Sequence, residues 1–208
     1  MKGPIASRIV VAVALVSGTL LVLTLYLPGM RPQPPSGMAS GTVAIGGPFT
    51  LVDTKGNTVT DASLKGRYSL VFFGFTHCPD ICPLTLQTIT QALEAGGPAA
   101  EAVQPVFITL DPERDTPETL AAYMENFHPR LMALTGTPEQ VRGATQSYKA
   151  YAAKVPVKDA EGKDTGDYTV SHTGYVYLMD TLGKYLAHFD KDAKAEDIAQ
   201  RLRQLKAS

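Results

Sequence analysis

The stretch that most constrains the fold is the apolar run Tyr68–Phe75, "YSLVFFGF", which two cysteines and a helical pattern follow at once. A continuous apolar run of this kind predicts a strand buried on both faces, in the middle of a sheet that helices cover. After the cysteines, Leu86, Ile89 and Leu93 recur at the spacing of one helix face, and the pattern ends near Gly96-Gly97. The chain is therefore expected to build a layered α/β domain around this strand and helix.

Strand and helix signals alternate through the next part of the chain. The run "VQPVFITL", residues 103–110, predicts a second buried strand. Two helices are then expected to begin at Thr116-Pro117 and Thr137-Pro138, because threonine is a good N-cap and proline suits the first helical position. A short strand separates the two helices in this interpretation.

Hairpins are expected at both ends of this region. "FTLVDTKGNTVT" predicts a small N-terminal β-hairpin, and "HTGYVYLMD" with "KYLAHF" predicts an antiparallel hairpin before a C-terminal helix. The segment 154–171, "KVPVKDAEGKDTGDYTVS", is expected to be a loop. The order predicts a thioredoxin-like α/β fold over residues 49–208, with a central mixed sheet, flanking helices and an N-terminal hairpin.

An apolar segment precedes this domain. Ile9–Leu27 is 19 uncharged residues long, and a helix of that length spans roughly 28 Å, close to the hydrocarbon thickness of a bilayer. The alternative is a cleaved signal peptide, but its apolar region is shorter, and the following "PGMRPQPP" offers no A-x-A site. No cysteine follows for lipoprotein processing. We therefore expect residues 9–27 to be an uncleaved transmembrane anchor.

Flanking charges predict the orientation of this anchor. Lys2 and Arg8 precede it and Arg31 follows it closely, so residues 1–8 should be cytoplasmic. Residues 28–48, with five prolines and five glycines, read as an extended tether. The protein is then a single-pass protein of the inner (cytoplasmic) membrane with its domain in the periplasm, an oxidising compartment in which cysteines are chemically consequential.

The overall charge argues against a nucleic-acid partner. The chain carries 19 basic and 20 acidic residues, a formal net charge of −1, without the basic excess that binding to phosphates requires. Three of the basic residues precede residue 32, so the remainder has 16 basic against 20 acidic residues. A mildly acidic domain of this kind suits docking on a basic surface.

Cys78 and Cys82 are the only cysteines of the chain. At a helix N-terminus, residues four apart are neighbours, and the partial positive charge there favours thiolates. A stapling disulfide is one interpretation, although closing so short a loop restricts the unfolded chain very little. A redox pair and a metal site are the others. The spacing is one residue wider than CxxC, which weakens a purely dithiol role, and two thiolates alone would need a third ligand to hold a metal.

Four histidines are candidates for that ligand. His77 is expected to face solvent on the turn, His128 to end a helix and His188 to lie on a strand surface. His172 stands at the entrance of the C-terminal hairpin, which in a thioredoxin-like arrangement packs beside the cysteine-bearing helix. Two thiolates and one imidazole suit copper, because thiolates select Cu(I) and imidazole helps to accommodate Cu(II).

Three separated motifs, "GFTHCPDICP", "DPERDTPETL" and "DYTVSHTGYVYLMD", together resemble the Sco/SenC family of membrane-anchored copper proteins. The resemblance covers residues 43–205 and implies a metallochaperone that delivers copper to the binuclear copper centre of cytochrome c oxidase. It implies that Cys78, Cys82 and His172 are the copper ligands, with Asp80 and Asp111 as outer carboxylates near the site. The implied partners are the copper-bearing oxidase subunit and an upstream periplasmic copper donor.

One position departs from the family pattern, and other functions stay open. An acidic or amide residue often precedes the histidine in this family, whereas this chain has Ser171, so the support of the imidazole is in question. A membrane-anchored thiol–disulfide reductase would use Cys78 to attack and Cys82 to resolve. A peroxidase and a non-catalytic assembly scaffold are further alternatives. Binding is favoured over enzymatic activity.

Overall fold

The computed structural model describes residues 44–205. The predicted cytoplasmic segment 1–8, the anchor 9–27 and the tether up to residue 43 lie outside the described residues. Among the helices of residues 44–205, none is long and apolar enough to cross a membrane. Residues 44–48, which were expected to belong to the tether, lie on the domain instead: the Gly46 N–H donates to the carbonyl oxygen of Ser147 at 2.9 Å, and Ile45 packs against the core.

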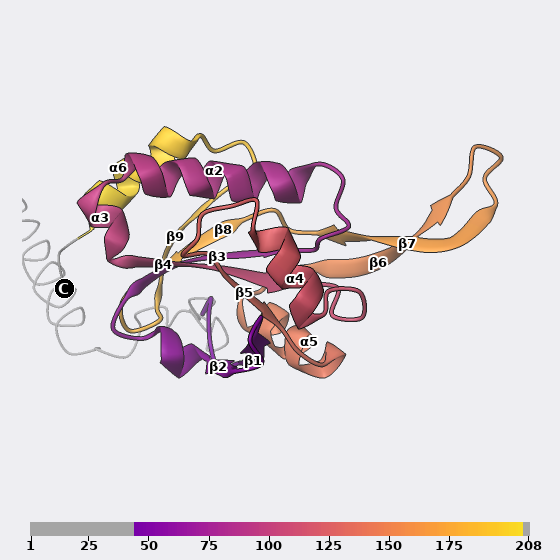
Figure 1. Ribbon diagram of the computed structural model, residues 1–208, viewed down its shortest axis with the longest axis horizontal. Helices are drawn as coiled ribbons and strands as arrows, with labels where there is room; N and C mark the ends of the chain where they lie inside the picture. The colour runs from indigo at the N-terminus through magenta and orange to yellow at the C-terminus, as the bar shows by residue number, and fades with distance from the viewer. Residues whose placement is uncertain (1–43, 206–208) are drawn as a thin grey trace, which may run out of the picture. The chain divides into compact units, whose positions relative to one another are not determined.

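One seven-stranded sheet forms the centre of the domain. Its strands are β1 (Thr50–Asp53), β2 (Thr58–Thr60), β3 (Tyr68–Gly74), β4 (Val103–Thr109), β5 (Met132–Thr135), β8 (Val176–Met179) and β9 (Tyr185–Phe189). They lie in the order β2-β1-β5-β4-β3-β8-β9 (Figure 1). β3, β4 and β5 are parallel, whereas β1 joins β5 and β8 joins β3 in antiparallel pairs. The predicted mixed sheet, with a hairpin at each end, is confirmed.

Helices cover both faces of this sheet. They are η1 (Asp61–Leu64), α2 (Ile81–Ala95), α3 (Pro98–Glu101), α4 (Pro117–Met124), α5 (Pro138–Ser147) and α6 (Ala195–Arg203). α2 and α6 pack together on one side, and α5 lies on the other (Figure 1). Leu86, Ile89 and Leu93 of α2 are buried, as their spacing predicts. The predicted N-caps are confirmed, since the Thr116 and Thr137 side chains accept from the backbone N–H three residues on.

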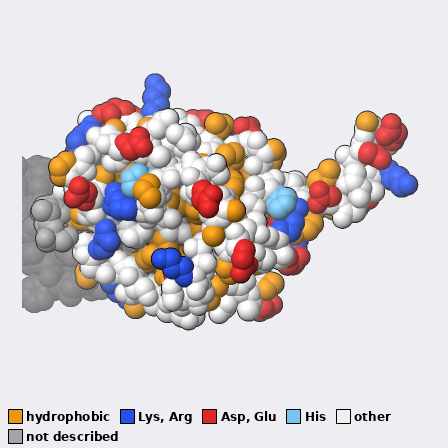
Figure 2. Space-filling model, viewed as in Figure 1, with side chains coloured by type: hydrophobic (Ala, Val, Ile, Leu, Met, Phe, Trp, Pro, Cys, Tyr) orange, Lys and Arg blue, Asp and Glu red, His pale blue; other side chains and the backbone are white. Residues whose placement is uncertain are grey.

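The prediction that residues 154–171 form a loop is wrong. This part of the chain forms β6 (Ala152–Lys158) and β7 (Asp164–His172), an antiparallel pair outside the main sheet. The pair, here called the arm, projects from the domain, with charged side chains at its tip (Figures 1 and 2). Most of its residues are exposed, so burial leaves only a short alternation at Tyr168, Val170 and His172, and the polar residues around it read as a loop. The arm begins where Ala152 pairs with His172.

Candidate metal centre

The two cysteines and His172 meet where β3 ends and α2 begins. The Cys78 Sγ, the Cys82 Sγ and a ring nitrogen of His172 all lie within 4.8 Å of one another. The Cys82 Sγ and the His172 Nε2 are 3.5 Å apart, although 90 residues separate them in the chain. Cys82 is fully buried, while Cys78 and His172 are partly exposed. The structure therefore brings together the three side chains that were expected to act as ligands.

The start of α2 supports the Cys78 sulfur. The backbone N–H of Cys82, in the first turn, donates to the Cys78 Sγ at 3.4 Å. Asp80 occupies the N-cap position, but its side chain makes no capping hydrogen bond. The cysteine sulfur thus takes the part of a capping acceptor, where free N–H groups and the helix dipole favour a negative charge.

This environment shifts the pKa values of the two thiols in opposite directions. A hydrogen bond from Cys82 lowers the pKa of Cys78 to about 3, and hydrogen bonds from the backbone N–H groups of Asp80 and Cys82 act in the same direction. The shared hydrogen bond and burial raise the pKa of Cys82 above its usual range. At neutral pH the metal-free pair therefore holds one thiolate, on Cys78, and one proton, on Cys82.

The imidazole of His172 is held in one tautomer. Its Nδ1 lies 3.0 Å from the carbonyl oxygen of Thr173, and because a carbonyl only accepts, Nδ1 carries the proton. The lone pair of Nε2 then faces Cys82. The rings of Phe72 and Phe75 stand edge-on to the imidazole, with centroids 6.3 and 5.9 Å away. A main-chain carbonyl and two aromatic rings thus orient the imidazole in a chain that has Ser171 where a carboxylate often stands.

Gly74, at the end of β3, makes room for the buried sulfur. A Cβ at this position would lie 2.9 Å from the Cys82 Sγ and 2.9 Å from Cε2 of Phe107. Both distances are shorter than ordinary van der Waals contacts. The absence of a side chain in "FFGF" therefore allows a sulfur atom to lie against the end of the strand.

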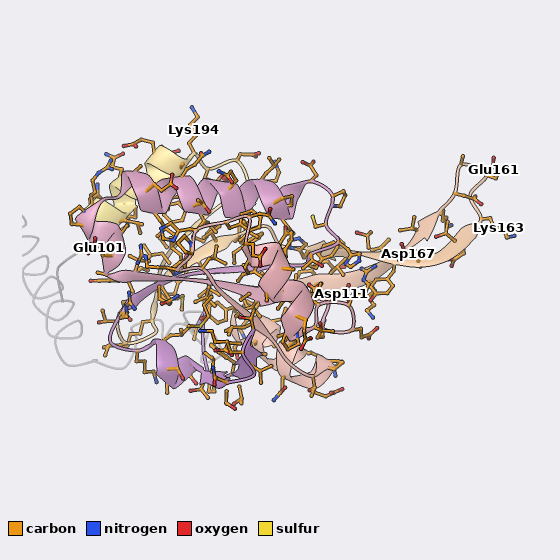
Figure 3. The ribbon with its side chains drawn as sticks, viewed as in Figure 1. Glu101, Asp111, Glu161, Lys163, Asp167 and Lys194 are labelled. Carbon is orange, nitrogen blue, oxygen red and sulfur yellow. The ribbon has the colours of Figure 1, made fainter. Side chains whose placement is uncertain are left out.

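The two carboxylates expected near the site lie differently. Asp80 is exposed, and only its backbone N–H supports the sulfur of Cys78. Asp111 is fully buried at the base of the arm, where it accepts from the Tyr168 hydroxyl at 2.7 Å and pairs with Arg114 (Figure 3). Its carboxylate is thus committed to the arm and not to the cysteines.

Asp115 is the acidic residue that sequence reasoning missed. It is fully buried, and it accepts from the backbone N–H and the hydroxyl of Thr76, two residues before Cys78, at 3.1 and 2.6 Å. Its negative charge contributes to the raised pKa of Cys82. The signal was present in "DPERDTPETL", which carries two candidate aspartates four residues apart.

The other three histidines lie away from this cluster. His77 is exposed, with its Nδ1 3.1 Å from the Thr76 hydroxyl, as expected of a turn residue. His128 lies beyond Met124, the last residue of α4, so the expectation that it ends a helix is wrong; burial and the neighbouring Arg130 lower its pKa. His188 is exposed on β9, 2.6 Å from the Tyr185 hydroxyl.

A cavity of about 330 Å³ borders the imidazole. Its walls include His172, Ile81 at the start of α2, Tyr175 and the loop Asp190–Asp192. Part of the cluster is therefore accessible from outside the domain, although Cys82 is buried.

The donor set suits a soft metal ion. Metal–sulfur and metal–nitrogen bonds of a first-row ion such as zinc are about 2.0–2.3 Å long, so donors of one ion lie no more than ~4.6 Å apart. The three donor atoms come close to that limit without an ion. Thiolates select soft ions such as Cu(I), and the mixed sulfur and nitrogen set argues against magnesium or calcium, which prefer oxygen.

Comparisons with known proteins agree with this geometry. The SCO2-like protein of Rickettsia felis is 37% identical over 199 residues, which cover 94% of this chain and 95% of that protein. A structure of Bradyrhizobium japonicum ScoI with copper bound superposes with a TM-score of 0.70 at 46% identity, over 77% of this chain and 99% of that one.

A second similar solved structure belongs to a protein with a redox property of its own. It is that of BsSco, a member of the Sco family of cytochrome c oxidase assembly proteins in which a disulfide switch has been identified. It superposes with a TM-score of 0.57 at 28% identity, over 77% of this chain and 92% of that one. The sequence model of the SCO1/SenC family matches residues 37–207. The chain therefore belongs to the SCO1/SenC family.

Proposed function

We propose that this protein is a copper metallochaperone, which binds copper through Cys78, Cys82 and His172 and delivers it to the binuclear copper centre of cytochrome c oxidase. The observation that carries the proposal is the convergence of two sulfurs and one imidazole nitrogen within 4.8 Å, in a member of a family whose solved structures include copper-bound forms. Thiolates hold Cu(I), and the imidazole extends the donor set to Cu(II).

The protonation of the metal-free site prepares it for copper. The Cys78 thiolate and the free lone pair of the His172 Nε2 are ready donors. Cys82 must lose its proton before its sulfur can bind as a thiolate, so copper binding at neutral pH releases a proton. Copper then leaves by ligand exchange, in which soft donors of the recipient replace these three side chains one at a time. The cavity beside His172 supplies the approach.

The N-terminal segment would restrict this exchange to the membrane surface. As a transmembrane anchor, residues 9–27 would hold the domain near a membrane-bound oxidase subunit and raise its effective concentration there. With residues 1–8 in the cytoplasm, the domain would work in the periplasm and take its copper from an upstream periplasmic donor.

The same thiols support a second function, reduction of the recipient's cysteines. Cys78 is the accessible thiolate and Cys82 the buried thiol, the arrangement of an attacking and a resolving cysteine. Cys78 would attack a disulfide of the recipient and form a mixed disulfide, and Cys82, on losing its proton, would displace the recipient's sulfur. The products are a Cys78–Cys82 disulfide and a recipient dithiol, and an upstream thiol reductant would restore the pair.

A transfer experiment separates these functions. The copper-loaded chain is mixed with the copper-free, reduced copper domain of an oxidase subunit, and the reduced metal-free chain with the same domain in its oxidised form. Delivery predicts that copper moves in the first mixture, and reduction predicts new recipient thiols in the second. His172→Ala should lose delivery and keep thiol reduction. If copper stays on the native chain in the first mixture, the chaperone proposal fails.

A further inference from the structure

We propose that the loop Asp111–Asp115, here called the brace loop, positions both halves of the metal site. Asp115 holds the turn that carries Cys78, and Asp111 with Arg114 holds the strand that carries His172. None of these residues is a ligand; each acts through the residue it positions. The inference rests on the proposed copper function, since its consequence is the distance between the thiolates and the imidazole.

The contacts on the cysteine side are made by Asp115. Its carboxylate accepts from the Thr76 backbone N–H and hydroxyl, and from the hydroxyl of Thr109 at 2.6 Å. Its own carbonyl oxygen accepts from the hydroxyl of Thr135 at 2.9 Å. Asp115 is thus tied to β4 and β5 on one side and to the turn before Cys78 on the other. With its carboxylate fully buried, loss of these bonds would leave polar groups without partners.

The contacts on the histidine side are made by Asp111 and Arg114. The Tyr168 hydroxyl donates to the Asp111 Oδ1 at 2.7 Å, and the Arg114 guanidinium donates to the other oxygen of that carboxylate. Arg114 also donates to the carbonyl oxygen of Tyr168 at 3.1 Å and stacks over its ring, 3.9 Å from the centroid. Both the side chain and the main chain of β7 are thereby held.

The strand β7 transmits this restraint to His172. Side chains of a strand alternate between its faces, so Tyr168, Val170 and His172 share one face. Val170 is buried and the other two are partly buried, which places this face against the domain. His172 lies four residues from Tyr168, at the end of the arm that the brace loop contacts.

The other strand of the arm is fixed by the same loop. Lys154 of β6 donates to Glu113 at 2.7 Å and lies over the Tyr168 ring, 4.3 Å from the centroid. Figure 3 shows Asp111 where the arm leaves the domain, with Asp167 further along the arm. The brace loop thus contacts the cysteine turn and both strands of the arm, and so relates two ligand-bearing segments that are far apart in the chain.

A double-mutant cycle on the full chain tests this inference. Tyr168→Phe removes the hydroxyl that reaches Asp111 and keeps the ring. Thr76→Val removes the hydroxyl that reaches Asp115 and keeps the shape. Each is made in the native and in the His172→Ala background, and Cu(I) affinity is measured by competition with a chelator. Thr145→Val, which removes a hydroxyl that donates to the carbonyl oxygen of Val141 within α5, is the control.

A metal-free measurement accompanies the cycle. The ring signals of ¹⁵N-labelled histidine are recorded for each chain without copper, with the His172 signal identified from its loss in His172→Ala. This readout reports the position and mobility of the imidazole, and it does not depend on whether the chain binds copper.

Substitutions at the partners of Asp111 and of Asp115 are expected to affect Cu(I) affinity and the His172 signal differently. Loss of one hydrogen bond weakens Cu(I) binding about fivefold. Tyr168→Phe should do so in the native background only, because it acts through His172, and it should also shift or broaden the metal-free His172 signal. Thr76→Val should weaken binding in both backgrounds and leave that signal in place. Thr145→Val should change neither quantity.

Two results would overturn the inference. An unchanged His172 signal in the metal-free Tyr168→Phe chain would show that the brace loop does not position the imidazole. Equal weakening by Tyr168→Phe in both backgrounds would show a general effect on the fold. If the native chain binds no copper, the proposed function fails. The metal-free spectra still decide whether the brace loop positions the His172 imidazole.

Discussion

Gly74→Ala is the substitution whose effect follows most directly from the geometry of the site. The added Cβ would lie 2.9 Å from the Cys82 Sγ, 2.9 Å from Cε2 of Phe107 and 3.1 Å from Cε1 of Phe72. All three neighbours are fully buried, so none can turn into solvent. The φ of Gly74 is not positive, so alanine fits the backbone and the effect is one of packing.

Overpacking of this kind destabilises a protein by about 1–3 kcal/mol. We expect the free energy of unfolding to fall by about 2 kcal/mol, which in a domain of this size lowers Tm by about 4–8 °C. Because the displaced atom is a ligand sulfur, Cu(I) affinity should fall about tenfold or more as well.

Gly143→Ala is the matched control. Gly143 lies in α5, and a Cβ there meets nothing within 4 Å, so alanine should stabilise the helix by about 0.5–1 kcal/mol. Denaturant unfolding of the full chain and chelator competition measure both quantities. The reasoning is refuted if Gly74→Ala unfolds at the same denaturant concentration as Gly143→Ala and binds copper as tightly.

Three further outcomes are expected. Because the pKa of Cys78 lies well below 5 and that of Cys82 is raised, iodoacetamide at pH 5 should modify Cys78 first, as mass spectrometry of peptides would show; preferential labelling of Cys82 would contradict the assignment. Asp115→Ala leaves one buried donor, on Thr109, and two part-buried donors, on Thr76, without an acceptor and should lower the free energy of unfolding by about 3 kcal/mol in urea; a loss below about 1 kcal/mol would mean that water replaces the carboxylate. Thr137→Ala removes an N-cap and should lower the free energy of unfolding by about 1 kcal/mol without changing copper affinity; weaker copper binding would contradict the separation of α5 from the site.

The sheet and its main helices could be predicted because burial leaves a direct trace in sequence. β3 and β4 lie in the centre of the sheet, so both read as continuous apolar runs. The arm leaves no such trace, since its strands are held by their own ladder and expose most side chains. A sequence such as "KVPVKDAEGKDTGD" then resembles a loop, although it is paired.

The metal site could be predicted only in part from the sequence, and for a different reason. The cysteine pair is local, and its position at the start of α2 follows from the apolar pattern around it. The contact between Cys82 and His172 spans 90 residues, and it was expected from the thioredoxin-like arrangement and the family resemblance, not from periodicity. Which aspartate of "DPERDTPETL" lies near the cysteines depends on the path of a short irregular loop. In that loop Asp115 contacts the turn before Cys78, whereas Asp111 contacts Tyr168 of the arm.

The central claim is that Cys78, Cys82 and His172 together hold one copper ion. Its most direct test is the copper stoichiometry and Cu(I) affinity of the reduced full chain beside Cys78→Ser, Cys82→Ser and His172→Ala, with Cu(II) spectra recorded for each. The account predicts one tightly held copper per native chain, clearly weaker binding in every variant, and a Cu(II) spectrum that changes when His172 is removed. Weak native binding that is indifferent to His172 would contradict it, and the two cysteines would then be a dithiol pair.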